Sequence, residues 1–205
     1  RPLSELQSRG VEVVKVKVDP KTGIVETAAL QAACLCKPTR LLVVNHCSNV
    51  IGTLQPIAGL GDWCREHNIL FMLDGAQSAG LLPIDLQALA VDLFAAPGHK
   101  GLLGPQGTGF LYIKDGIELT PLIYGGTGTN SSSDLQPANM PERFESGTLN
   151  LPGLAGLHAA LQFLLQIGIE QIHNRETQLI EKILTGLQKL ERVKIYGSDN
   201  VMLRL

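Results

Sequence analysis

The sequence predicts an α/β fold: a mostly parallel β-sheet with helices on both faces. Three short apolar runs, 41–44, 69–73 and 91–96, have the continuous hydrophobic character of strands buried on both sides. Amphipathic segments such as 56–67 separate or follow these runs, as expected for helices that cover such a sheet. Polar residues follow the end of each run, where open α/β sheets carry their binding groups.

Length and charge limit the classes of protein. The 205 residues can form one sizeable core, or one domain and the start of another. Of these residues 44% are hydrophobic and the formal net charge is -2, so no electrostatic footprint for nucleic acid or an acidic membrane surface is present. The sequence contains no apolar run of membrane-spanning length and no signal-peptide pattern at its start. We therefore expect no nucleic-acid partner and no membrane partner.

The four cysteines, in the absence of a secretory signal, predict reduced thiols and a cytoplasmic protein. Cys34 and Cys36 are interpreted as helix-packing residues, because no second Cys/His pair has the spacing of a zinc site. No metal site is predicted.

The first part of the chain predicts a helix, a strand and a second helix. The helix over 3–8 ends at Gly10. The segment 11–18 alternates Val with Glu or Lys, which favours a strand with one polar face. Thr27 is expected to cap a short helix that Pro38 ends.

The middle of the chain adds two helices and another strand. The helix 56–67 places Ile57, Leu60 and Cys64 on one side, and 85–89 is expected to form a short helix. The strand 108–113 follows the strand 91–96 after a short loop, so it must run antiparallel to its neighbour.

The last part of the chain predicts a loop, two helices and two strands. The loop 125–139 is rich in Gly, Ser, Thr and Asn, and we expect it to be mobile and to act as a lid. One helix begins at Pro152 or Gly153 and ends at Ile167, and the next covers 169–190. The second helix carries an apolar stripe made of Ile172, Leu179, Ile183, Leu187 and Leu190. Strands are expected at 193–196 and 202–205.

Two reactive side chains follow neighbouring buried strands. Pro97-Gly98 ends one strand and is followed by His99 and Lys100, while Asp74 follows the strand 69–73. A lysine and a carboxylate at one sheet edge are the pair that pyridoxal 5'-phosphate needs. The amine forms a Schiff base with its aldehyde, and the carboxylate keeps the ring nitrogen protonated. The alternative is an exposed lysine on an ordinary turn.

Other glycine-rich sites do not fit the spacing. Lys100 is followed by Gly101, whereas a P-loop lysine is followed by Ser or Thr. The glycines of 104–109 do not match the dinucleotide fingerprint, and the sequence contains no Gly-x-Ser-x-Gly nucleophile elbow.

Four motifs in order resemble a known family. They are Asn45-His-Cys-Ser-Asn49-Val-Ile-Gly-Thr53, Asp74-Gly-Ala-Gln77-Ser78, Gly98-His99-Lys100 and Arg143-Phe-Glu-Ser-Gly-Thr148. This order resembles the cysteine desulfurase and selenocysteine lyase group of the class V aminotransferases, which are fold type I pyridoxal-phosphate enzymes. The stretches Gly104-Pro-Gln-Gly-Thr-Gly109 and Gly125-Gly-Thr-Gly128 resemble a cysteine desulfurase-like branch of that group. The resemblance covers nearly the whole chain.

The resemblance implies a role for each matched residue. Lys100 would be catalytic and form the Schiff base, while Asp74 would contact the ring nitrogen of the cofactor. Asn49 and Gln77 would donate to the phenolic oxygen, and His99 would contact the phosphate. For Asn49 the alternative is a turn-capping asparagine, and for His99 it is a histidine that packs beside the lysine.

Two further residues bear on the phosphate. Thr148 is matched to a residue that reaches the phosphate of the partner subunit, which implies a homodimer with sites at the interface. Its motif could also be a turn stabilised by an Arg–Glu pair. Pro97 departs from the family pattern, in which a Ser or Thr at this position donates to the phosphate.

The function implied is a cysteine desulfurase-like lyase that removes sulfur or selenium from cysteine or selenocysteine, a small amino-acid substrate, and passes sulfur to an acceptor protein. The alternatives are an aminotransferase or epimerase of the same family, or an inactive fragment that lacks part of the site. The matched family's sulfur-accepting cysteine lies after the lysine, and no cysteine here follows Cys64. The persulfide step is therefore not assigned to this chain.

The resemblance also implies the domain organisation. Family members are longer, so an internal fragment is expected. Residues 1–168 would form the C-terminal part of the large cofactor-binding domain. Residues 169–205 would form a linking helix and the start of a small α+β C-terminal domain.

Overall fold

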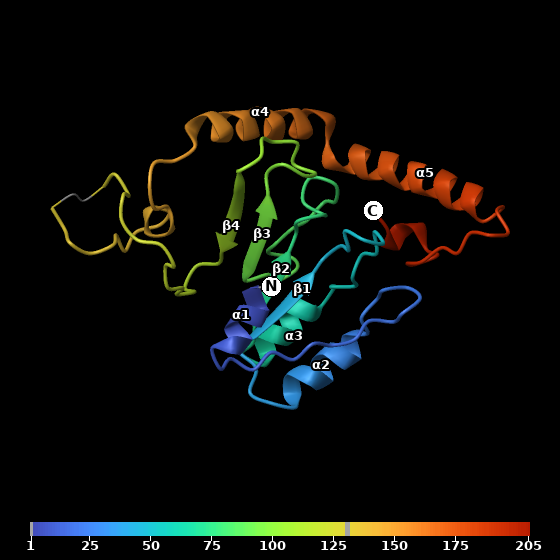
Figure 1. The fold of residues 1–205 in the computed structure, drawn as a ribbon, viewed down its shortest axis with the longest axis horizontal. Helices are drawn as coiled ribbons and strands as arrows, with labels where there is room; N and C mark the ends of the chain where they lie inside the picture. Colours follow the sequence, from blue (N-terminus) through green and yellow to red (C-terminus); the bar gives the residue numbers. More distant parts are fainter. Residues whose placement is uncertain (1, 130–131) are drawn as a thin grey trace.

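The computed structural model describes residues 2–129 and 132–205, and it has a four-stranded mixed sheet flanked by helices (Figure 1). The strands are β1 (Leu41–Asn45), β2 (Leu70–Asp74), β3 (Leu93–Pro97) and β4 (Gly109–Ile113), in this spatial order. β1, β2 and β3 are parallel, and β4 is antiparallel to β3. The predicted fold class and the antiparallel strand are confirmed.

The register aligns the carboxyl ends of the parallel strands. Asn45 lies opposite Asp74, and Asp74 lies opposite Ala95 on β3. The loops that follow β1, β2 and β3 therefore leave the sheet at the same edge, which we call the carboxyl edge.

Five α-helices and two 3-10 turns complete the described elements. They are α1 (Pro2–Ser8), α2 (Thr27–Leu35), α3 (Leu60–Glu66), α4 (Leu151–Ile167), α5 (Ile169–Leu187), η1 (Glu142–Phe144) and η2 (Val201–Leu203). Thr27 is the first helical residue of α2 and not its cap, since the cap position is Glu26. The helix predicted over 56–67 begins only at Leu60, after Gly59 in a left-handed conformation.

Three predicted strands are absent from the described residues. The segment 11–18 has no ladder, because no described strand lies beside it to accept its hydrogen bonds. The segment 193–196 is likewise irregular. The end of the chain forms η2 and not a strand, although Arg204 makes an isolated antiparallel bridge with Thr53.

The helix predicted over 85–89 is also wrong. The Asp85 carboxylate accepts from the backbone amides of Gln87 and Ala88, and the chain makes only one turn, closed by the bond from Leu89 N to Asp85 O. Ala90 then takes a positive φ of 51°, so no helix continues.

The core lies mainly on one face of the sheet, where alternate residues of β1, β2 and β3 are buried. The intervening residues of β1 and β2 are half-buried or exposed, so the prediction that these strands are buried on both faces is wrong. Phe71 and Leu73 on β2 are fully buried, as are Leu60 and Cys64 on α3. Cys34 packs into this core as predicted, but Cys36 at the end of α2 is exposed, so its predicted packing role is wrong.

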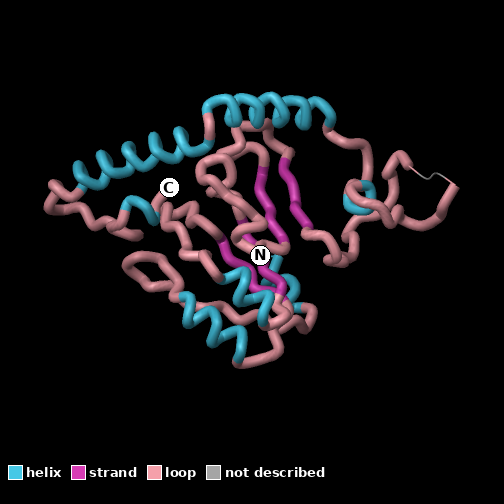
Figure 2. The backbone as a smooth tube through the Cα atoms, turned by 180° about the vertical axis from the view of Figure 1, so that it is seen from behind, coloured by secondary structure: helices cyan, strands magenta, loops and turns pink. Residues whose placement is uncertain are grey.

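α4 and α5 form a bent arm along one side of the molecule (Figures 1 and 2). They meet at Gly168 and are bent by 77°. Leu184 is the buried residue of α5, whereas Leu179 and Ile183 of the predicted stripe are exposed. Among the described helices, none alone is long and apolar enough to cross a membrane, although this bent pair passes that test by length and composition.

Two predictions concern parts that the structure does not test. The predicted domain boundary at 168 coincides with the break between α4 and α5, but it stays a prediction. The predicted lid loop 125–139 includes residues 130 and 131, which lie outside the described residues, and its mobility stays a prediction.

Candidate active site

Lys100 lies in a tight loop at the carboxyl edge, directly after β3. The loop is closed by hydrogen bonds from Gly98 N to Thr108 O (2.8 Å) and from Gly104 N to Gly98 O (2.7 Å). The Lys100 carbonyl accepts from Leu103 N at 2.9 Å, which holds its backbone. Its half-buried side chain makes no hydrogen bond or ion pair with a described residue, so the amine is available to a ligand.

Asp74 ends β2, the strand next to the one that carries Lys100. Its Oδ1 accepts from the backbone N–H of Ala76 at 2.9 Å, which orients the carboxylate. Its Oδ2 has no partner among the described residues and can accept from a ligand. The loop after Asp74 contacts the Lys100 loop through Gly80 and Gly101. The predicted delivery of an acid and a lysine to one edge is thus what the topology shows.

Asn49 and Gln77 follow β1 and β2 at the same edge. Asn49 is exposed, and Ser48, not Asn49, caps its turn: Ser48 Oγ accepts from the amides of Val50 (3.2 Å) and Ile51 (3.4 Å). The alternative of a turn-capping asparagine is therefore not supported. Gln77 is half-buried in the turn after Asp74, and its amide makes no bond to a described residue.

His99 is exposed, directly before Lys100. Thr148 is also exposed, in the segment between η1 and α4, and makes no hydrogen bond with the other predicted site residues. The Arg–Glu pair proposed for its motif is not formed. Arg143 donates to the carbonyl of Leu119 at 3.1 Å instead. The role assigned to Thr148 stays a prediction.

A buried pair at this edge was missed by the sequence reasoning. His46 Nδ1 and Ser78 Oγ are 2.9 Å apart, with side chains 8% and 0% exposed. Burial lowers the pKa of His46 to about 4, so the imidazole is neutral at physiological pH. The sequence did offer one indication of His46: it directly follows the predicted strand 41–44 and Asn45, at the same edge of the sheet where His99 follows the strand 91–96.

Cys47 lies beside this pair but is not a reactive thiol. It is 1% exposed, and its Sγ lies 3.5 Å from the carbonyl of Gly52. Burial raises the pKa of the thiol to about 11, so the thiolate form is scarce at neutral pH.

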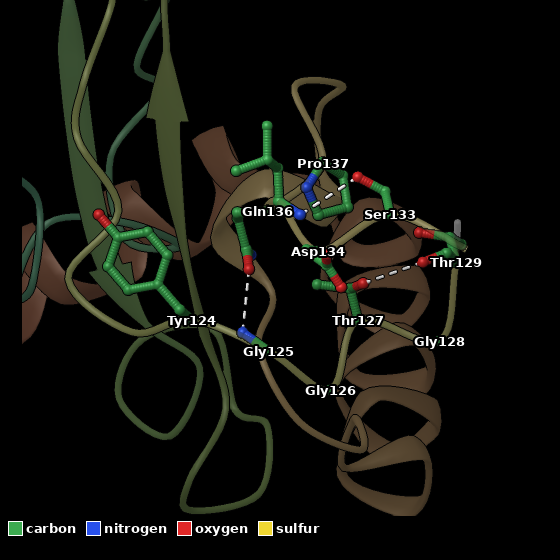
Figure 3. A pocket seen from close by; sticks show the side chains of 11 residues that line it. Tyr124, Gly125, Gly126, Thr127, Gly128, Thr129, Ser133, Asp134, Gln136 and Pro137 are labelled. Atoms are coloured by element: carbon green, nitrogen blue, oxygen red, sulfur yellow. Dashed lines mark hydrogen bonds between the residues drawn. The ribbon is translucent and has the colours of Figure 1, made fainter. Parts of the chain in front are cut away.

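A separate cavity of about 430 Å³ lies in the loop between β4 and η1 (Figure 3). Its lining comes from residues 124–129 and 133–137, and Gln136 Oε1 accepts from Gly125 N at 2.9 Å. None of the residues predicted to bind the cofactor lines this cavity. The loop extends away from the sheet in both views of the fold, so it belongs to a different part of the surface (Figures 1 and 2). Within 2–129 and 132–205, no group of three or more His, Cys, Asp or Glu residues could hold a metal.

The fold and this edge define the class of protein: an α/β protein in which parallel strands bring a carboxylate and an unpaired lysine to one edge. The chain belongs to the aminotransferase class-V family, whose model matches residues 1–203.

Several curated relatives of this chain are named cysteine desulfurases. The chain is 37% identical over 200 residues to a probable cysteine desulfurase of Methanothermobacter thermautotrophicus, covering 96% of this chain and 50% of that protein. It is 36% identical over 167 residues to a cysteine desulfurase of Shigella flexneri, covering 79% and 41%. The chain thus spans about half the length of the curated relatives it matches.

Solved structures with similar sequences have the same fold. The apo structure of cysteine desulfurase from Thermococcus onnurineus NA1 superposes with a TM-score of 0.89 at 33% identity, covering 99% of this chain and 51% of that one. The structure of SspA in complex with cysteine has a TM-score of 0.66 at 32% identity, covering 78% and 43%. The predicted resemblance and the predicted fold are confirmed.

Proposed function

We propose that the protein carrying this chain is a pyridoxal-phosphate-dependent cysteine desulfurase-like lyase that acts on cysteine or selenocysteine. The observation that carries the proposal is the placement of Asp74 at the end of β2 and of Lys100 in the loop after β3, the adjacent parallel strand, at one edge. Relatives and structural neighbours named cysteine desulfurase support the reaction.

The donor set fits the ring and aldehyde end of pyridoxal 5'-phosphate. The Lys100 amine and Asp74 Oδ2 have no partner among the described residues, and the amides of Asn49 and Gln77 are equally uncommitted. These residues would hold the aldehyde, the ring nitrogen and the phenolic oxygen, respectively. His99 would donate to the phosphate, whereas Pro97 has no backbone N–H to offer.

The chemistry of the chain's own residues follows from this placement. When bound, the cofactor supplies an electron sink for the carbanion left by loss of the substrate α-proton. Asp74, whose Oδ1 accepts from Ala76 N–H, would contact the ring nitrogen through its Oδ2 and hold a proton there. Lys100 Nζ would hold the aldehyde of the cofactor and would accept the substrate α-proton.

The proposal extends to partners and location. Thr148 would contact the phosphate bound by a second copy, which makes the protein a homodimer. The exposure of Thr148, and the projection of the preceding loop away from its own sheet, support this arrangement (Figure 1). The substrate would be a small amino acid, the sulfur acceptor would be a protein, and the enzyme would be cytoplasmic.

A second candidate is an aminotransferase, which the description of the family model supports. No cysteine follows Cys64 in the chain, and the Cys47 thiol is buried with a raised pKa, so this chain itself offers no sulfur acceptor near Lys100. Products separate the two reactions. With an added thiol reductant, which supplies the two electrons needed to release the sulfur as sulfide, a desulfurase yields alanine and sulfide from cysteine, whereas an aminotransferase forms a keto acid.

The test is covalent trapping in the full-length protein. The protein is reconstituted with pyridoxal 5'-phosphate, reduced with borohydride and mapped by peptide mass. We expect the label on Lys100, and sulfide release that is lost in Lys100→Arg. Lys114→Arg is the matched control, because Lys114 is committed to an ion pair with Asp92 at 3.1 Å and should not carry the label. A label on another lysine, or keto acid without sulfide, would contradict the proposal.

A further inference from the structure

The loops that carry Asn49 and Gln77 are joined by one side-chain bond. His46 Nδ1 lies 2.9 Å from Ser78 Oγ, and no other described side chains bond the loop after β1 to the loop after β2. The two loops also share one backbone bond, from His46 N to Asp74 O at 3.0 Å. Beyond the end of the ladder, His46–Ser78 is therefore the side-chain hydrogen bond that links the two loops among the described residues.

Both partners are themselves anchored. The His46 carbonyl accepts from Gln55 N at 2.9 Å, which closes the base of the Asn49 loop. The Ser78 carbonyl accepts from Leu81 N (3.1 Å) and Leu82 N (3.0 Å), and Ser78 N donates to Gly75 O at 3.1 Å. Because each residue is fixed within its own loop by backbone hydrogen bonds, a shift of one loop is expected to move the other through the His46–Ser78 bond.

The pair lies close in sequence to the residues it would position. Ser78 directly follows Gln77, and His46 shares its strand end with Asn45, which lies opposite Asp74. Because both side chains are buried, the bond is shielded from competing water. The bond therefore lies beside both loops that carry the two amides expected at one oxygen of the cofactor.

We propose that His46 and Ser78 are positioning residues, whose hydrogen bond sets the location of Asn49 relative to Asp74 and Gln77. The expected effect on cofactor binding rests on the proposed function, whereas the expected coupling of the two loops does not. The imidazole acts here by holding position and not by transferring a proton.

The experiment compares Ser78→Ala, His46→Leu and His46→Asn in the full-length protein. Asparagine can present a hydrogen-bonding atom near the place of Nδ1 and is the conservative rescue. Thr39→Val is the matched control, because it removes a hydroxyl bond of similar length (3.0 Å, to Cys34 O) at the other end of β1. Readouts are backbone amide exchange without cofactor, the dissociation constant for pyridoxal 5'-phosphate, and the visible band of the bound cofactor.

Without cofactor, Ser78→Ala should raise amide exchange in 48–53, across the bond from the substitution. His46→Leu should raise it in 75–79. With cofactor, both variants should bind about tenfold more weakly, as loss of one buried hydrogen bond implies, and should shift the visible band. His46→Asn should restore exchange and spectrum toward wild type, and Thr39→Val should change neither.

Unchanged exchange across the bond would overturn the proposal, whether or not the protein binds cofactor. Altered exchange with wild-type affinity and spectrum would also overturn it, since the pair would then be only structural. A wild-type protein that fails to trap cofactor on Lys100 would contradict the proposed function alone, and the exchange data would still decide on the coupling.

Discussion

Gly80 and Gly101 contact each other backbone to backbone, and this contact joins the loop after Asp74 to the loop that carries Lys100. A Cβ atom on Gly80 would lie 2.3 Å from Gly101 O, and one on Gly101 would lie 2.4 Å from Ala79 O. Neither position has room for a side chain, so the approach of the two loops requires glycine on both sides.

Gly80→Ala should therefore separate the two loops. Gly80 also has a φ of +85°, so the substitution adds backbone strain to the clash, and we expect a loss of about 2 kcal/mol or more in the free energy of unfolding. Gly116→Ala is the matched control, because Gly116 has a φ of +84° with nothing within 4 Å of the added Cβ. Denaturant unfolding gives the free energy of unfolding of both variants, and the difference between them measures the clash at Gly80. Equal losses in the two variants would show that the Gly80–Gly101 contact does not contribute to stability.

Asp74→Asn should spare most cofactor binding and lower turnover by about a hundredfold or more, if charge stabilisation here matches other preorganised sites. An amide cannot keep the ring nitrogen protonated, so the carbanion is poorly stabilised. Asp62→Asn makes the same chemical change at an exposed pair with Arg65 and should leave turnover unchanged. Steady-state sulfide release measures both variants, and near-normal turnover in Asp74→Asn would remove Asp74 from this role.

The 205-residue chain tested alone should bind the cofactor weakly and release no sulfide. It offers groups for the ring, but Pro97 lacks a donor and only His99 is predicted to reach the phosphate from the same chain. Each missing charge-assisted hydrogen bond costs roughly 1.5–3 kcal/mol, so two or three would weaken binding by several powers of ten. Cofactor titration beside the full-length protein measures this. Tight stoichiometric binding with sulfide release by the chain alone would refute the expectation.

The exposed face of α4 should make the same chain associate with itself. Leu151 and Leu165 are 66% and 77% exposed, while Leu157 and Leu164 on the opposite face are buried. An apolar face of this kind on a free surface favours association. Sedimentation over a range of concentrations should show association that falls in Leu151→Gln and Leu165→Gln. Leu157→Gln, in contrast, should lower stability. A monomer at every concentration would count against this prediction.

Acid should destabilise the fold through His46. Its folded pKa is about 4, against an ordinary value of 6.5, so the unfolded chain binds the proton first. Stability is therefore complete above pH 6.5 and falls as the pH drops toward 4, by about 3 kcal/mol in total. Chemical unfolding between pH 7 and pH 4 should show a steeper loss in wild type than in His46→Asn, which does not titrate. The neighbouring Cys47 has a raised pKa and does not titrate between pH 7 and pH 4. Parallel stability profiles for wild type and His46→Asn would contradict the assignment of the acid sensitivity to His46.

The apolar runs were enough to predict the central strands and their neighbours. β1, β2 and β3 are continuous apolar runs, which a sequence displays directly, although only alternate residues of β1 and β2 are buried in the structure. The short loop before β4 predicted its antiparallel direction for a purely geometric reason. The same reasoning placed Asp74 and Lys100 at one edge, because residues that follow adjacent parallel strands must leave the sheet together.

Tertiary structure alone decided the rest. The alternating segment 11–18 has the composition of a strand but no partner beside it, and strand formation depends on a neighbour that local sequence does not specify. The His46–Ser78 bond and the Gly80–Gly101 contact join loops that are far apart along the chain. Each arises only once β1, β2 and β3 lie in register, because that register brings the loops close enough for an imidazole to meet a hydroxyl and for two glycines to touch.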